Sequence, residues 1–301
     1  MGTLAAMDRG LIPPPGPRRG ASRRVPAPGP RPQPVVPAGT VSCKRCHQRF
    51  VADRYDRMLR VCPHCGHHGT VGAAQRLVQL ADSESLARIK LDDLGDRDPL
   101  SFDDGVPYPQ RVTEARSRTG LSETFALGRA AIGGHPAVLA CMDFGFLGGS
   151  LGSAAGESFA RACEIAVAER CALIAVCTSG GARMQEGIAS LAQMARCTAG
   201  VSAVSAAGLP YITVLADPCY GGVTASFAVQ GDVIIAEPLA RIGFAGGRVI
   251  EQATHDKLPD GFQTAEFLLQ HGMVDAVVPR PQLRGVLTVL LAALGGGGPT
   301  A

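Results

Sequence analysis

The sequence predicts an α/β domain preceded by a small zinc ribbon, and two patterns carry this prediction. Near the N-terminus, four cysteines form two Cys-x-x-Cys pairs that are separated by fifteen residues. From residue 121 onward, short apolar runs typical of strands alternate with helical patterns, and glycine pairs stand at the junctions. With 301 residues, of which 46% are hydrophobic, the chain can bury a large core.

The four cysteines predict a structural Zn²⁺ site. Two Cys-x-x-Cys pairs at this separation allow four thiolates to converge on one tetrahedral ion. Pro63 and Gly66 suit the tight turn that aims the second pair inward. We therefore expect one structural Zn²⁺ ion in a ribbon over residues 39–70, rather than redox or chance cysteines. The expected ligands are Cys43, Cys46, Cys62 and Cys65.

The other six cysteines stand singly in apolar surroundings, which favours buried core residues in a reducing compartment over a disulfide framework. They are Cys141, Cys163, Cys171, Cys177, Cys197 and Cys219. No apolar run approaches the roughly 18 residues of a membrane span, and no secretory signal is recognisable. We expect a cytoplasmic protein that makes no membrane contact.

Residues 1–38 are expected to form a disordered tail that is rich in proline and arginine. Residues 1–39 hold ten of the 22 prolines, with six arginines against one aspartate, so this segment carries a charge of +5. A contact with RNA or an acidic partner is one interpretation of this charge. A solvated extension is the other.

The remaining domain, residues 71–301, begins with a polar, acidic stretch up to about residue 120. Within it, residues 76–80 have a helical pattern and residues 92–104 are typical of a surface loop. Two apolar runs joined by the turn sequence at 133–136 then predict a hairpin. Its strands are expected at 125–132 and 137–143.

The elements after the hairpin follow the α/β pattern. The helix at 154–170 has apolar residues at the 3.6-residue period, and Gly295–Gly298 stops the last helix. The remaining strands are expected at 172–178, 211–216, 232–236, 240–244 and 273–278. The remaining helices are expected at 183–206, after 222, and at 263–270 and 282–294.

Three glycine-rich junctions, at 147–150, 178–183 and 220–224, are the candidate binding features. A strand that ends in Gly-Gly before a helix presents unpaired N–H groups at the positive end of the helix dipole. Such a site can bind phosphate or stabilise a thioester enolate, and glycine permits a close approach that a Cβ would block. For any single pair, tight helix–sheet packing is the alternative.

Several common catalytic motifs are missing from the sequence. It contains no Gly-Lys-Ser/Thr phosphate loop, and Ser179 lacks the Gly-x-Ser-x-Gly setting of a nucleophilic serine. Glu157 and Glu186 are more typical of surface or capping residues than of a general base. A site with donors but no base suits a reaction in which the partner substrate supplies the base.

Three longer runs carry a family resemblance: TSGGARMQEG at 178–187, YGGVTASFA at 220–228 and RVIEQ at 248–252. Shorter runs of the same kind are 236–238, 242–246, 257–259, 261–263 and 266–268. With the four-cysteine ribbon, they resemble the carboxyltransferase β subunit of bacterial acetyl-CoA carboxylase. The likeness covers about residues 40–294. One departure is Gly247, where many relatives carry proline.

The resemblance implies a crotonase-like fold of ββα units that form a spiral, preceded by the zinc ribbon. It implies an α2β2 complex whose active site lies between the β chain and a separate α subunit. The reaction would move a carboxyl group from carboxybiotin, on the biotin carboxyl carrier protein, to acetyl-CoA, giving malonyl-CoA for fatty-acid biosynthesis. Biotin carboxylase would charge the biotin. No methionine flanks Lys44, Lys90 or Lys257, so the biotin must sit on another protein.

The resemblance also implies roles for individual residues. The backbone amides of Gly180 and Gly181 would hold the thioester oxygen of the acyl-CoA. Gly221 and Gly222 would line the same cleft. Arg183 would orient the turn or pair with a substrate phosphate, or else form a structural salt bridge at the helix start. The ureido group of biotin would take the α-proton.

Two alternatives stay open at this point. The acceptor is propionyl-CoA or another acyl-CoA, since a linear sequence does not measure the acyl pocket. In a different class, the chain binds RNA through its basic ribbon and its N-terminal tail, with strong salt dependence. The ribbon cations are Lys44, Arg45, Arg49, Arg54, Arg57 and Arg60.

Overall fold

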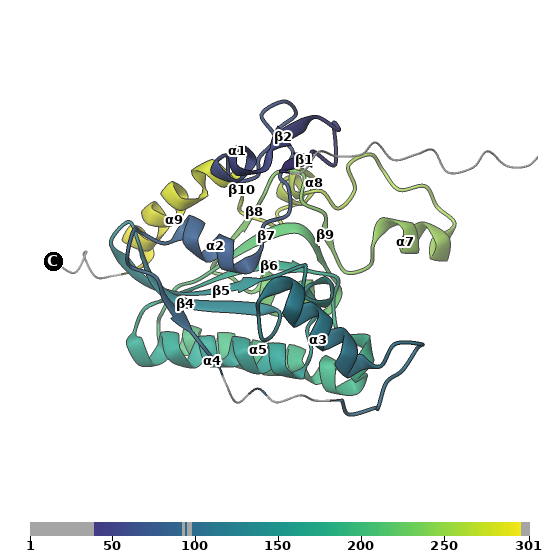
Figure 1. Ribbon diagram of the computed structural model, residues 1–301. Helices are drawn as coiled ribbons and strands as arrows, with labels where there is room; N and C mark the ends of the chain where they lie inside the picture. The colour runs from purple at the N-terminus through teal and green to yellow at the C-terminus, as the bar shows by residue number, and fades with distance from the viewer. Residues whose placement is uncertain (1–38, 92–93, 95–97, 296–301) are drawn as a thin grey trace, which may run out of the picture. The chain divides into compact units, whose positions relative to one another are not determined.

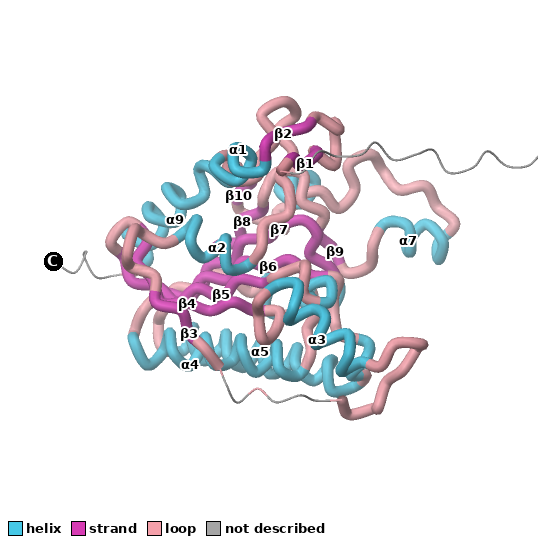
Figure 2. Tube along the Cα trace, in the orientation of Figure 1, coloured by secondary structure: helices cyan, strands magenta, loops and turns pink. Residues whose placement is uncertain are grey.

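The computed structural model describes residues 39–91, 94 and 98–295 (Figures 1 and 2). The expected tail at 1–38 and part of the loop at 92–104 lie outside these residues. The described chain begins with a small ribbon and continues into a mixed sheet that is covered by helices on both faces. No described helix is both long enough and apolar enough to cross a membrane.

The ribbon is a two-stranded antiparallel sheet followed by a short helix. Strand β1 (Thr40–Ser42) pairs with β2 (Arg49–Val51), with Val41 opposite Phe50. Helix α1 (Ala52–Arg57) follows directly and buries Tyr55, whose ring stacks on Phe50 with 5.5 Å between ring centroids. This aromatic pair forms the ribbon's own small core.

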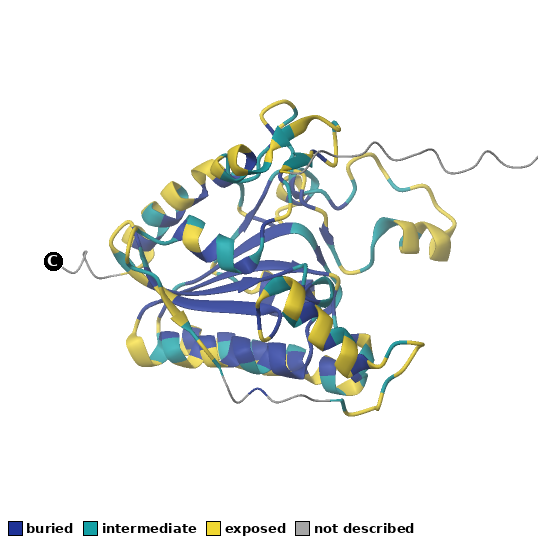
Figure 3. Ribbon diagram, in the orientation of Figure 1, coloured by how far each residue is buried: buried dark blue, intermediate teal, exposed yellow. Residues whose placement is uncertain are grey.

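The main sheet has eight described strands, ordered β10-β8-β7-β6-β5-β4-β3, with β9 beside the end of β7. Strands β5 to β8 and β10 run parallel, and β3 and β4 are antiparallel additions at one edge. Their bounds are β3 Ala87–Ile89, β4 Phe125–Ile132, β5 His135–Met142, β6 Ala172–Ser179, β7 Tyr211–Tyr220, β8 Val233–Ala236, β9 Ile242–Gly243 and β10 Ala276–Val277. Every residue of β6 is buried (Figure 3), as expected for a central parallel strand that is covered on both faces.

Helices cover the two faces of the sheet in separate groups. Helices α4 (Ser153–Glu169), α5 (Ile188–Ala206) and α8 (Ala265–Gln270) share one buried apolar cluster with alternate strand residues. Helices α2 (Ala73–Leu80), α3 (Tyr108–Thr119) and α9 (Arg280–Leu294) share the other. Figure 1 shows α4 and α5 on one side of the sheet and α2 and α9 on the opposite side.

Most of the sequence-derived elements are confirmed. The hairpin is β4 and β5, with Phe125 opposite Met142, and all six single cysteines are buried. The helix expected at 183–206 is interrupted, because Gly187 takes φ +54° and ψ −129° between a short 3-10 turn, η2 (Met184–Glu186), and α5. Helices α3 and α7 (Gly247–Thr254) and strand β3 were not predicted.

Candidate metal centre and glycine-rich site

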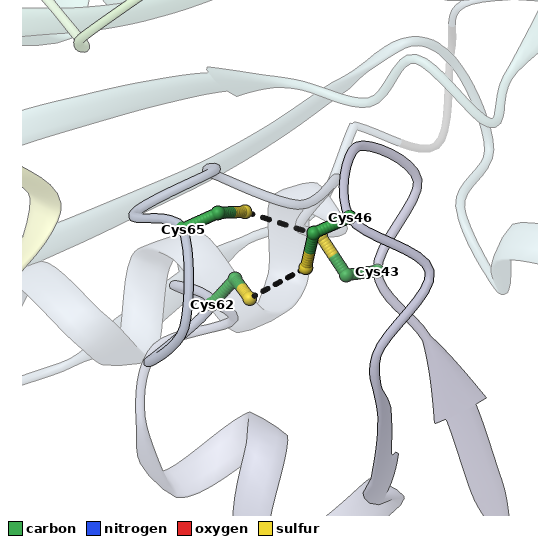
Figure 4. Close-up of side chains that lie close together, drawn as sticks. All are labelled: Cys43, Cys46, Cys62 and Cys65. Atoms are coloured by element: carbon green, nitrogen blue, oxygen red, sulfur yellow. Dashed lines mark hydrogen bonds between the residues drawn. The ribbon is translucent and has the colours of Figure 1, made fainter.

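The four ribbon cysteines lie together, as Figure 4 shows. The Sγ atoms are 3.7 Å apart for Cys43 and Cys65, and 3.6 Å apart for Cys46 and Cys62. All four sulfurs lie within 4.8 Å of one another. A tetrahedral ion with Zn–S bonds of about 2.3 Å requires sulfur–sulfur separations of about 3.8 Å. The donor set and its spacing therefore fit Zn²⁺.

Two turns of the same shape present these sulfurs. In the first, the His47 amide donates to the Cys43 carbonyl (3.0 Å), and in the second, the Gly66 amide donates to the Cys62 carbonyl (2.9 Å). His47 and Gly66 both have positive φ, +58° and +68°, at the equivalent position of each turn. The expected role of Gly66 in the second turn is thus confirmed.

The first turn also favours a thiolate. Burial opposes ionisation of Cys43, but backbone N–H groups of Cys46 and Arg45 outweigh it and lower the pKa of this thiol to about 7. The Arg45 amide lies 3.4 Å from the Cys43 sulfur. For Cys46 the Gln48 amide favours the thiolate, but burial and the neighbouring cysteine sulfurs outweigh it and raise the pKa to about 12. The first turn therefore favours the thiolate, which is the metal-binding form, at Cys43 alone.

The two glycine pairs named in the sequence analysis meet at one edge of the sheet. Gly180 and Gly181 follow β6, and Gly221 and Gly222 begin the short helix α6 (Gly221–Thr224) after β7. A Cβ on Gly181 would lie 3.3 Å from the Gly221 Cα, and one on Gly221 would lie 2.9 Å from the Gly181 Cα. The turns can touch because both positions lack side chains.

The amides predicted to hold the thioester oxygen are engaged within the chain. The Gly180 amide donates to the Gly148 carbonyl at 2.8 Å, and the Gly181 amide donates to the Ser179 hydroxyl at 2.9 Å. In this conformation neither amide is free to bind a ligand, so the geometry does not support that part of the expectation. The Gly222 amide, in the first turn of α6, has no acceptor among the described residues.

Gly180 differs from its neighbours because a Cβ atom added at this position would have free space around it. A side chain there would meet only the Gly148 carbonyl, at 3.6 Å, and the residue is exposed. By contrast, a Cβ on Gly222 would lie 2.9 Å from the Met194 sulfur. The third junction also contributes, since Gly148 lies in the short 3-10 turn η1 (Leu147–Gly149). The three glycine junctions therefore meet at one surface, although Gly181 and Gly222 themselves are buried.

Arg183 does not reach this surface, and the substrate-binding role expected for it is not supported. Its side chain is 1% exposed and binds the Glu123 carboxylate through two N–H groups, at 2.5 and 2.9 Å. The same guanidinium contacts Glu186, the Tyr108 hydroxyl and Ser150. Burial alone would lower the pKa of Arg183, but Glu123 raises it above its usual value. Arg183 is therefore a structural ion-pair residue, the alternative named from the sequence.

Glu123 and Tyr108 are partners that no sequence pattern predicted, whereas Glu186, expected at the surface or as a capping residue, is buried and caps the first residue of α4. Glu186 is 2% exposed and accepts hydrogen bonds from the Tyr108 hydroxyl and the Ser153 amide, both at 2.6 Å. Glu123 and Tyr108 lie 60 and 75 residues from Arg183 in the chain. No local motif marks pairings over such separations.

Comparison with known proteins adds independent findings. Residues 87–265 match the carboxyl transferase domain family. The chain is 53% identical over 257 residues to the acetyl-coenzyme A carboxylase carboxyl transferase subunits beta/alpha of Salinispora arenicola, covering 85% of this chain but 45% of that protein. It is 51% identical to the corresponding subunit beta of Gloeobacter violaceus, covering 85% of this chain and 83% of that one. The chain thus spans less than half of its beta/alpha relatives.

Two solved structures confirm the fold. The transcarboxylase 12S structure with methylmalonyl-coenzyme A bound has a TM-score of 0.64 at 24% identity, covering 80% of this chain and 43% of that one. A Pseudomonas malonate decarboxylase hetero-tetramer in complex with malonate has a TM-score of 0.60 at 25% identity, covering 79% and 86%. The expected crotonase-like carboxyltransferase fold, preceded by a four-cysteine cluster, is confirmed.

Proposed function

Because this chain belongs to the family of acetyl-CoA carboxylase carboxyltransferase β subunits, we propose that it transfers a carboxyl group from carboxybiotin to acetyl-CoA to form malonyl-CoA. The observation that supports this most directly is the meeting of two glycine turns at the carboxyl ends of β6 and β7. Ligands of open α/β sheets bind at the carboxyl ends of the strands. The exposed backbone of Gly180 leaves room there for an acyl thioester, because only the Gly148 carbonyl lies near its Cβ position.

We assign the thioester to the open side of Gly180, with the Gly222 amide as the donor that faces its oxygen. The amides of Gly180 and Gly181 then shape the turn through Gly148 and Ser179, and they bind the oxygen only if these internal bonds open. A preorganised donor at a developing oxyanion contributes roughly 3–4 kcal/mol to the transition state. The Gly222 amide is suited to this role because it has no acceptor among the described residues.

The proton acceptor is proposed to come from the partner substrate. Glu123 and Glu186 are the buried carboxylates near the glycine turn, and both already hold Arg183. A carboxylate that is committed to an ion pair is a poor general base. Carboxybiotin would first release its carboxyl group as CO2, and the freed ureido group would accept the α-proton of acetyl-CoA. The resulting acetyl-CoA carbanion would then attack the CO2 to form malonyl-CoA.

The ribbon is proposed to hold one structural Zn²⁺ through Cys43, Cys46, Cys62 and Cys65. Four sulfur ligands close the coordination sphere, which is typical of a structural ion with no open catalytic position. The partners are proposed to be a carboxyltransferase α subunit in an α2β2 complex, the biotin carboxyl carrier protein and biotin carboxylase. The fusion named in the beta/alpha relatives supports an α-type companion.

The test is a reconstituted assay with purified chain, α subunit and carboxylated carrier protein. We expect malonyl-CoA from acetyl-CoA, with a lower kcat/KM for propionyl-CoA. Faster turnover of propionyl-CoA would reassign the substrate. Absence of turnover with either thioester, in a complex shown to be assembled, would remove the proposal. Tight, salt-dependent RNA binding lost on substitution of Arg49 and Arg54 would support the RNA-binding alternative.

A further inference from the structure

A buried charge cluster joins the two ends of the described chain. Arg76 on α2, Glu237 directly after β8, and Arg280 at the start of α9 are 4%, 1% and 5% exposed. Arg76 Nη1 lies 2.7 Å from Glu237 Oε1. Glu237 is itself fixed to the sheet, because its amide donates to the Leu215 carbonyl of β7 at 2.9 Å.

Arg280 binds the sheet and the ribbon at the same time. Its Nε and Nη2 donate to the two oxygens of Glu237, at 2.7 and 2.5 Å. Its Nη1 donates to the carbonyls of Leu59 and Gly69, at 2.8 and 3.0 Å. These two carbonyls belong to the four-cysteine ribbon and lie 221 and 211 residues away in sequence.

The buried N–H donors of Arg280 need the two ribbon carbonyls as acceptors. Two guanidinium groups share one carboxylate, so the buried cluster carries an excess positive charge. Buried donors of a charged group need acceptors, because leaving them unpaired is costly. The third neighbour, His68 Nδ1, lies 3.4 Å from Glu237 Oε2 and adds no acceptor to Arg280. Without the folded ribbon, Arg280 Nη1 loses both of its acceptors.

The ribbon needs Arg280 in return. Leu59 and Arg60 both adopt left-handed backbone conformations, with φ +54° and +56°. Such conformations in residues other than glycine persist only where surrounding contacts hold them. The Gly69 amide binds the Arg60 carbonyl at 2.8 Å, while Arg280 binds the carbonyl of Leu59. Arg280 thus stabilises the turn that leads into the second cysteine pair.

The same cluster reaches the residues that precede the glycine turns. A small cavity of about 20 Å³, enough for roughly one water molecule, is lined by His68 and Gly69 of the ribbon, by Glu237, and by Thr178 and Asp217 at the strand ends. Thr178 directly precedes the turn at 179–181, and its hydroxyl donates to the Pro218 carbonyl at 3.1 Å. Pro218 lies two residues before Tyr220, where β7 ends.

We propose that Arg280 is a positioning residue that couples metal loading of the ribbon to the order of the two glycine turns. With metal bound, the ribbon supplies the two carbonyls that hold Arg280 on Glu237, and the strand ends at Thr178 and Asp217 stay in place. With metal lost, Arg280 lacks these acceptors and the strand ends loosen. The relevance to carboxyl transfer rests on the proposed function, but the coupling itself does not.

The test measures this coupling without an activity assay. Full-length protein is compared with and without metal, using hydrogen exchange of peptides that contain residues 178–183 and 219–224. The variant is Arg280→Gln. The matched control is Arg284→Gln, one turn along α9, whose guanidinium is half exposed and pairs with Asp82 at the surface. Release of Zn²⁺ to a colorimetric chelator is followed in parallel.

We expect metal removal to accelerate exchange in both peptides by about 10-fold in the wild type and in Arg284→Gln, and very little in Arg280→Gln. Metal release should be about 10-fold faster in Arg280→Gln. If Arg280→Gln fails to fold, Arg280→Lys retains a charge for Glu237 but cannot reach both carbonyls, and it should show the same loss of coupling. Equal acceleration in all variants, or none in the wild type, would overturn the proposal.

Discussion

Replacing Gly180 by alanine separates the proposed binding surface from the fold. The residue has no positive φ, and the new methyl group would contact only the Gly148 carbonyl, at 3.6 Å. A glycine-to-alanine change at such a position commonly stabilises a protein by roughly 0.4–1 kcal/mol, because it restricts the unfolded chain. We therefore expect the free energy of unfolding of Gly180→Ala to equal or slightly exceed that of the wild type.

The same methyl group stands where the thioester is proposed to lie. A displacement of the reacting group by about 1 Å can cost 100-fold in rate. We expect kcat/KM for carboxyl transfer to fall by at least about 100-fold, which corresponds to roughly 2.7 kcal/mol. Urea unfolding of the purified chain and the reconstituted transfer assay measure the two quantities independently.

Gly221→Ala is the contrasting variant. Gly221 has φ +61°, which costs alanine about 1–2 kcal/mol, and its new Cβ would lie 2.9 Å from the Gly181 Cα. Overpacking of this kind costs about 1–3 kcal/mol more, so this variant should lose stability as well as activity. Gly285→Ala in α9, which has no atom within 4 Å of its Cβ position, should be as active as the wild type. Full activity of Gly180→Ala would refute the proposed placement of the thioester.

Three further predictions concern the ion pairs and the metal. Arg183→Met should destabilise the protein by about 3–5 kcal/mol in urea unfolding, because it leaves Glu123 and Glu186 buried without their partner; a raised KM at unchanged stability would instead indicate a substrate contact. Cys46→Ser should lower the zinc content measured by mass spectrometry, and an unchanged stoichiometry would count against a four-sulfur site. Burial opposes ionisation of Glu237, but Arg76 and Arg280 hold its pKa well below its usual range. The stability that Glu237 contributes should therefore be complete above about pH 4.3 and fall away below it. The difference in unfolding free energy between wild type and Glu237→Gln should accordingly shrink as the pH falls, whereas a constant difference would contradict the assignment.

Local patterns were sufficient to predict most of the secondary structure. The uninterrupted apolar run of β6 and the turn at Gly133–Gly134 each point to one structure, and the protein contains both. The Cys-x-x-Cys pairs are equally local, so their convergence followed from spacing alone. Helix α7 escaped prediction because it spans only eight residues, about two helical turns, and buries none of them.

The polar interior was not predictable in the same way. Arg183 stands in a motif that suggests a ligand contact, yet its partner Glu123 comes from 60 residues earlier. Glu237 stands in one of the short runs that carry the family resemblance, but nothing in that run points to Arg280, and the two meet only because β8 and the start of α9 lie at one end of the sheet. Ion pairs between distant segments leave no periodic pattern in the amino-acid sequence. The sequence alone therefore does not distinguish residues that face a ligand from residues that form structural ion pairs.

The burial of six cysteines has a practical consequence for handling this protein. Desolvation raises the pKa of Cys141, Cys163 and Cys219 to about 12, so these sulfurs stay protonated and shielded from alkylating reagents. Cys46 and Cys65 in the ribbon are only partly covered. A maleimide dye added to native protein should therefore label the ribbon cysteines when no metal is bound and spare them when a metal holds their sulfurs. The buried cysteines should add little background fluorescence.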